Sequence, residues 1–130
     1  MQVPCPTIAE CPDELLVAKL GTAGRDRYCL FRDTFSAGWG EHGRGCELKP
    51  ASAASFIRFL TAMPPPQYRP PTLFLTDDGH LELIWRDVAG YSVQIEFADS
   101  MVEFYLESTG QEGVWPADSS ERLSELLPAP

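Results

Sequence analysis

The sequence predicts a single α+β domain over residues 1–130, in which two or three helices cover one face of a four-stranded antiparallel β-meander. The chain has 130 residues, of which 44% are hydrophobic, and this suits one domain with a substantial core. Apolar residues recur with a helical period before the proline-rich stretch "MPPPQYRPP" and with a period of two after it. Turn-forming residues separate the period-two segments, as expected for a meander.

The first part of the chain, residues 1–62, is expected to be mainly helical. A first helix is predicted over residues 12–20, because Pro12 suits a first helical turn, two acidic residues follow it, and Gly21 is able to end the helix. Residues 26–35, "DRYCLFRDTF", fit either a strand or an irregular segment, and the pattern does not decide between them.

A second helix is predicted over residues 50–62. It begins with Pro50, and its apolar residues recur at positions that form one face of a helix: Ala53, Phe56, Ile57 and Leu60. Five prolines in residues 63–71 favour an extended backbone, so this segment is interpreted as a stiff connector between the helical part and the sheet.

The meander is predicted over residues 72–107. Its four strands alternate apolar and polar residues, and they are expected at residues 73–76, 81–86, 91–97 and 102–107. The apolar face should be covered by the helix over residues 50–62, and the other face should be acidic. A last helix is predicted over residues 118–127, with Asp118 or Ser119 as its N-cap.

Charge is distributed unevenly along the chain. Of the formal net charge of −9, residues 1–76 contribute +1 and residues 77–130 contribute −10. An acidic surface repels nucleic acids and anionic membranes, so neither is an expected partner, whereas a protein with a basic groove is. The first residues lack the basic and apolar regions of a signal peptide, and no apolar run would span a membrane, so a cytoplasmic location is expected.

The stretch "GWGEHGRGC", residues 38–46, is the strongest candidate for a local metal site. His42 and Cys46 could provide two zinc ligands, with Cys29 or His80 added from elsewhere. Zinc sites usually contain a paired Cys-x-x-Cys knuckle, which this chain lacks, so no metal or other cofactor is expected. The cysteines are then expected to be free thiols with a packing role: Cys5, Cys11, Cys29 and Cys46.

The same stretch does not fit a phosphate-binding loop. A P-loop needs Gly-Lys-Ser/Thr directly before its helix, and Glu41 and Glu47 would repel an anion. We interpret the stretch as a joint in which Trp39 packs as an anchor while Gly40, Gly43 and Gly45 permit close turns. The chain also lacks a Gly-x-Ser-x-Gly elbow, and its carboxylates gather on the predicted acidic face, so it is not expected to be an enzyme.

The predicted acidic face is the candidate partner-binding surface. It combines carboxylates with an amide and two apolar side chains: Glu82, Ile84, Gln94, Glu96, Glu103, Tyr105 and Glu107. This mixture suits a protein partner with basic and apolar features, although an ordinary solvated sheet face has a similar composition. An edge strand of the meander is also a place where a partner strand can add.

Four motifs, in order, resemble those of a widespread class of small bacterial proteins. They are a Trp-Gly loop at residues 38–45, an apolar helix at residues 52–63, the Pro-Pro joint at residues 70–71, and "DGHLELIW" at residues 78–85. The class has an acid and then a glycine after the tryptophan, where this chain has Gly40 and Glu41, and it has Leu-Glu-Trp where this chain has Leu-Ile-Trp. Its association with mobile elements and defence genes implies an antitoxin, immunity or phage-encoded inhibitor role.

Three functional hypotheses follow from these observations. The first is a small, acidic, non-catalytic protein-binding module that inhibits or neutralises its partner, as an antitoxin, immunity protein or anti-CRISPR protein does, in monomeric or homodimeric form. The second is a metal-dependent or thiol-dependent enzyme that uses His42 and Cys46. The third is a structural subunit of a larger assembly.

Overall fold

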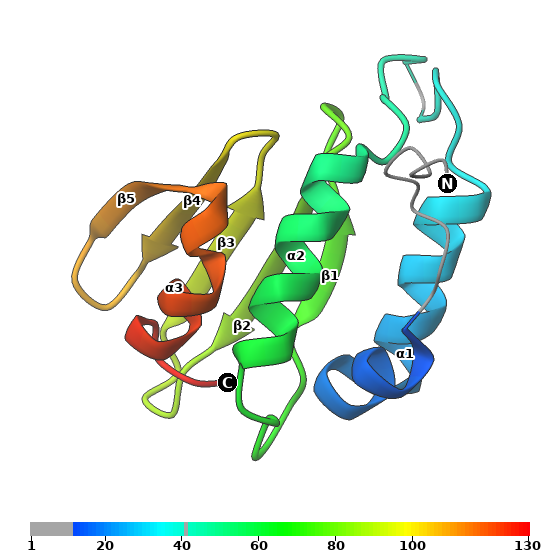
Figure 1. The fold of residues 1–130 in the computed structure, drawn as a ribbon. Helices are drawn as coiled ribbons and strands as arrows, with labels where there is room; N and C mark the ends of the chain where they lie inside the picture. The colour runs from blue at the N-terminus through cyan, green and yellow to red at the C-terminus, as the bar shows by residue number, and fades with distance from the viewer. Residues whose placement is uncertain (1–11, 41) are drawn as a thin grey trace, which may run out of the picture.

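The computed structural model of the protein describes residues 12–40 and 42–130. Its five strands form one antiparallel sheet in sequential order; α2 and α3 lie on one face of that sheet, and α1 lies beside α2 and β1 (Figure 1). The α+β prediction is therefore confirmed. In chain order the elements are α1 (Asp13–Asp33), α2 (Pro50–Ala62), β1 (Thr72–Leu75), β2 (Leu81–Arg86), β3 (Ser92–Phe97), β4 (Met101–Leu106), β5 (Gln111–Pro116), a 3₁₀ turn (Ala117–Ser119) and α3 (Ser120–Leu126).

The prediction of four strands was wrong, because β5 extends the meander beyond residue 107. Gly113 and Pro116 both disfavour a strand in the sequence pattern. In the structure, the ring of Phe104 lies against Gly113, where an added Cβ would come within 2.6 Å of it. Pro116 is tolerated because it ends an edge strand, where its missing N–H is not needed by β4.

Helix α1 begins where the sequence predicts, but it does not end at Gly21. Gly21 has a φ of 77°, so it forms a kink, and the chain resumes a helical path that continues to Asp33. Residues 26–33 are therefore helical, which answers the question that the local pattern left open. Tyr28 and Phe31 are buried in the core, and this packing outweighs the weak helix propensity of the segment.

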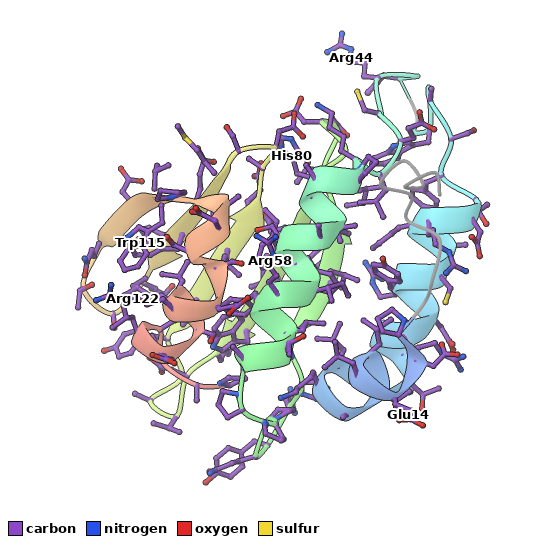
Figure 2. All side chains as sticks on the ribbon, in the orientation of Figure 1. Glu14, Arg44, Arg58, His80, Trp115 and Arg122 are labelled. Carbon is purple, nitrogen blue, oxygen red and sulfur yellow. The ribbon has the colours of Figure 1, made fainter. Side chains whose placement is uncertain are left out.

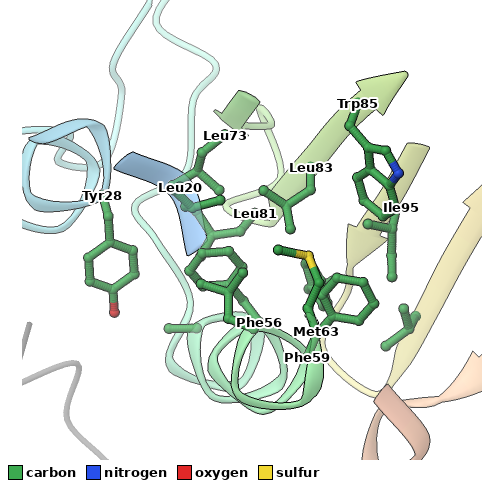
Figure 3. Packing of buried hydrophobic residues seen from close by; sticks show 14 of the residues in the cluster. Leu20, Tyr28, Phe56, Phe59, Met63, Leu73, Leu81, Leu83, Trp85 and Ile95 are labelled. Atoms are coloured by element: carbon green, nitrogen blue, oxygen red, sulfur yellow. The ribbon is translucent and has the colours of Figure 1, made fainter. Parts of the chain in front are cut away.

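The predicted helix over residues 50–62 is confirmed as α2, which lies across the middle of the sheet (Figure 1). Phe56 is fully buried, with its ring 5.8 Å from that of Tyr28 and 5.6 Å from that of Phe97. Phe59 packs against Phe97 and Trp85. Figure 3 shows these rings between α2 and the inner face of the sheet, where the aliphatic side chains of β1, β2 and β3 meet them.

The last helix is shorter than the predicted 118–127, because residues 117–119 form a 3₁₀ turn and α3 covers only Ser120–Leu126. Ser119 occupies the N-cap position but makes no side-chain capping hydrogen bond. Leu123 and Leu127 are buried, whereas Leu126 is 57% exposed. No helix in the described ranges has the length and apolar character that crossing a bilayer requires.

Replacing Phe56 by alanine should lower the free energy of unfolding by about 3 to 5 kcal/mol, because the change leaves a cavity between α2 and the sheet. Chemical denaturation followed by circular dichroism measures this loss. Tyr68, which is 77% exposed in the connector, provides the control. Tyr68→Ala should change the stability by no more than about 0.5 kcal/mol. Equal effects of the two substitutions would contradict this description of the core.

Candidate functional site

The outer face of the sheet, which no described helix covers, carries all the residues predicted to bind a partner. Strand residues alternate between the buried inner face and this outer face, with a consistent alternation in β2, β3 and β4. The predicted set lies on it together: Glu82, Ile84, Gln94, Glu96, Glu103, Tyr105 and Glu107. Tyr91, the first residue of the predicted strand over residues 91–97, lies outside β3 and is half exposed.

Three glutamates form a row across the middle of the outer face. The strand register places Glu82 directly opposite Glu96, and Glu96 directly opposite Glu103. Residues opposite each other on one face of an antiparallel pair have their Cβ atoms about 5 Å apart, and like charges at that distance repel. We call these three residues the glutamate row. The sheet therefore holds three carboxylates together at the centre of its open surface.

The pKa of Glu82 is raised above its ordinary value of 4.5. Partial burial is the larger cause, because it penalises the charged carboxylate, and the negative charge of Glu96 adds to it. Within the described part of the chain, neither Glu82 nor Glu103 has a salt bridge to a cation. The folded protein thus keeps a carboxylate in an environment that favours its neutral form.

The middle residue of the glutamate row, Glu96, is contacted by His80, which the sequence pattern suggested only as a zinc ligand. The Nδ1 atom of His80 lies 3.0 Å from a carboxylate oxygen of Glu96. Its Nε2 atom lies 3.6 Å from Asp99, and Asp99 in turn accepts a hydrogen bond from Lys49 at 3.2 Å. Figure 2 shows His80 at the end of the sheet. This cluster occupies one oxygen of Glu96, whereas Glu82 and Glu103 have no salt bridge to a cation among the described residues.

A second row runs beside the glutamate row and mixes polar with apolar side chains. Ile84 lies opposite Gln94, Gln94 opposite Tyr105, and Tyr105 opposite Glu112 of β5. Except for Ile84, the residues of the two rows line a shallow hollow with a volume of about 480 Å³. Val114, opposite Glu103, adds an apolar side chain that is 54% exposed. Sequence reasoning missed Glu112 and Val114 because it missed the strand that carries them.

Glu107 differs from the other carboxylates of the predicted set, because a backbone group engages it. Glu107 follows directly after the end of β4, and its carboxylate accepts a hydrogen bond from the backbone N–H of Ser92 at 3.1 Å. At the same end of the sheet, Arg86 donates to the carbonyl of Gly90 at 2.8 Å. Glu107 and Arg86 therefore stabilise local backbone, and the glutamate row is the more available part of the surface.

The described residues of the glycine-rich stretch, 38–40 and 42–46, meet across a short bridge, as the joint interpretation predicts. Trp39 and Gly45 form a β-bridge, and the Trp39 indole N–H donates to the carbonyl of Cys46 at 2.5 Å. A Cβ on Gly45 would lie 2.3 Å from the Trp39 ring, so only glycine allows this approach. At the end of the loop, the backbone N–H of Cys46 donates to the backbone carbonyl of Asp77. This bond ties the loop to the β1–β2 turn.

The described residues do not bring the candidate zinc ligands together. Across residues 12–40 and 42–130, no group of three or more His, Cys, Asp or Glu side chains has a geometry that could hold a metal ion. Cys29 is half-buried in α1, whereas His42 and Cys46 are exposed in the loop. Three residues of the sequence predictions lie outside the described residues: Cys5, Cys11 and Glu41.

Comparisons with known proteins leave the outer face to be interpreted from its own chemistry. No family model matches the chain, and no curated protein or solved structure matches it either.

Replacing Glu82 by glutamine should raise the free energy of unfolding at pH 7 by about 0.5 to 1 kcal/mol, because it removes a like-charge contact. The folded-state pKa of Glu82 is raised, so the folded protein binds this proton more tightly than the unfolded chain does. Ionisation of Glu82 therefore lowers the free energy of unfolding as the pH rises above 4.5. The stability gained by Glu82→Gln over the wild type should shrink as the pH falls towards that value.

Denaturation curves of the wild type and of Glu82→Gln between pH 7 and pH 4.5 measure this difference in stability. Glu112→Gln is the matched control, because Glu112 lies on the same face opposite Tyr105 rather than another carboxylate. A Glu82→Gln protein that is no more stable than the wild type at pH 7, or an equal gain from Glu112→Gln, would contradict the account of the glutamate row.

Proposed function

We propose that the protein is a non-catalytic protein-binding module, and that the outer face of its sheet blocks a basic surface of its partner. The observation that carries this proposal is the glutamate row at the centre of the open face. Two of its carboxylates, those of Glu82 and Glu103, have no salt bridge to a cation in the described structure.

The electrostatics of the outer face support a basic partner. Each carboxylate of the glutamate row is repelled by its neighbour in the free protein, and a lysine or arginine placed over the row would relieve that repulsion. Most of the negative charge of the chain lies in residues 77–130, which contain β2 to β5, so the long-range field also attracts a cationic surface. A nucleic acid or an anionic membrane would be repelled by the same field.

The apolar side chains of the outer face support a protein partner rather than small cations alone. Tyr105 is 38% exposed, Val114 54% and Met101 50%, and all three lie within or beside the two rows. Aromatic residues and methionine are enriched at protein interfaces, where they supply apolar contact area between polar groups. The resemblance to small bacterial proteins of mobile elements adds the expectation that the blocked partner is a toxin or a defence protein.

Charge reversal on the outer face tests this proposal against a control with the same net charge. Glu103→Lys combined with Glu112→Lys should weaken binding of a partner captured from bacterial lysate by at least about tenfold, because two interface charges become repulsive. Glu121→Lys combined with Glu125→Lys reverses two exposed charges on α3 and should have little effect. Binding by the wild type should also weaken as the salt concentration rises.

Isothermal titration calorimetry with the purified partner at two or more salt concentrations measures these affinities, and circular dichroism verifies that each variant is folded. Equal affinities for the two double variants, or binding that does not respond to salt, would exclude the electrostatic mechanism.

A further inference from the structure

The two edges of the sheet differ in whether a described helix packs against them. At the β1 edge, α1 packs alongside the strand, and the Arg27 guanidinium donates to the outward carbonyl of Leu73 at 2.7 Å. The same guanidinium lies 5.2 Å from the centre of the Phe74 ring. Arg27 thus occupies one acceptor that a partner strand would need, and α1 lies where such a strand would pack.

At the β5 edge, the hydrogen-bond pattern identifies which groups point outward. The backbone N–H of Ala117 donates to the backbone carbonyl of Ser100 at 3.1 Å. These two residues continue the register of β4 and β5 by one position, so they form a hydrogen-bonded pair. Hydrogen-bonded and non-bonded pairs alternate along an antiparallel ladder. Gly113 and Trp115 therefore bond to β4, whereas the N–H and C=O groups of Glu112 and Val114 point away from the sheet.

No described element covers these outward groups. Within residues 12–40 and 42–130, no backbone hydrogen bond reaches Glu112 or Val114 from beyond β5. Both residues are exposed, and their side chains lie on the outer face, in line with Tyr105 and Glu103. An added antiparallel strand could form about four backbone hydrogen bonds with this pair of residues, two with each.

The two sides of the β5 edge differ in chemistry, and this difference indicates the partner. On the outer face, a sixth strand would continue the two rows beside Glu112 and Val114, within the field of Glu103. On the inner face, it would lie beside Trp115, which is only partly buried against the core (Figure 2). The outer side chains of that strand should therefore be basic, and its inner side chains should be apolar.

The geometry points to β5 as the site where an extended, amphipathic basic segment of the partner protein adds to the sheet as a sixth strand. This inference rests on the proposed function and names the mode of binding. The β5 edge of a second copy of this chain is a poorer occupant, because it would bring together two chains that each have a net charge of −9. Pro116 at the end of β5 limits the added strand to the Glu112–Val114 segment.

The test uses a synthetic peptide of alternating lysine and valine, blocked at both ends, as the probe. We expect the peptide to bind the full-length protein and to slow the exchange of the Glu112 and Val114 amide hydrogens, measured by NMR. The Gly113 and Trp115 amides are matched internal controls, because they already bond to β4. N-methylation of the peptide at the backbone positions that face β5 should weaken binding by at least about tenfold, whereas N-methylation at the alternate positions should have little effect.

A second comparison tests the same edge from the side of the protein. Val114→Pro removes an outward N–H without removing a bond to β4, so it should weaken peptide binding by about tenfold, whereas Val114→Thr retains the N–H and the affinity. Equal binding by the two N-methylated peptides would overturn the inference, as would no binding of the unmodified peptide at millimolar concentration. Sedimentation that shows a wild-type dimer, together with loss of that dimer in Val114→Pro, would also overturn the inference.

The outcomes separate this inference from the proposed function on which it rests. If Glu103→Lys with Glu112→Lys weakens binding of the captured partner while Val114→Pro does not, the outer face binds its partner without strand addition, and only the inference fails. If neither change weakens that binding, the proposed function fails as well.

Discussion

The packing of α2 against the middle of the sheet is the contact on which the rest of the structure depends. Phe56 and Phe59 meet Phe97 and Trp85 there, at ring distances between 5.5 and 6.1 Å. Because strand side chains alternate with a period of two, burying one set against α2 assigns every other strand residue to the opposite face. Helices α2 and α3 lie on one face only, so this contact also determines which surface of the protein remains open (Figure 1).

The open face carries a cost that the core outweighs. Like charges opposite each other on a sheet destabilise it by up to about 1 kcal/mol per pair, whereas a single buried phenylalanine contributes several times that. A sheet anchored by Phe56 can therefore hold Glu82, Glu96 and Glu103 in one row and remain folded. Repulsion that is tolerated in the free protein and relieved by a cationic partner is an arrangement suited to binding.

The two edges of the sheet differ in the same way as its two faces, because one is covered and the other is open. Arg27 satisfies the outward carbonyl of Leu73, and α1 packs alongside β1, so this edge is covered. β5 lies at the other end, where the acidic face and a free backbone edge meet. In the proposed complex, charge would attract the partner over a distance and backbone hydrogen bonds at the edge would align it, so the two features would act at different stages of one association.

Periodicity and charge in the sequence were sufficient to predict α2, four of the strands and the face on which the glutamates lie, because these depend on the positions of residues within single elements. Three features required the tertiary structure. Residues 26–33 are helical because Tyr28 and Phe31 pack on the core, β5 exists because the Phe104 ring lies against Gly113, and Glu82 is opposite Glu96 because strand pairing determines the register. Each of these depends on contacts between residues far apart in the chain or in different elements, which the local pattern of a single sequence does not contain.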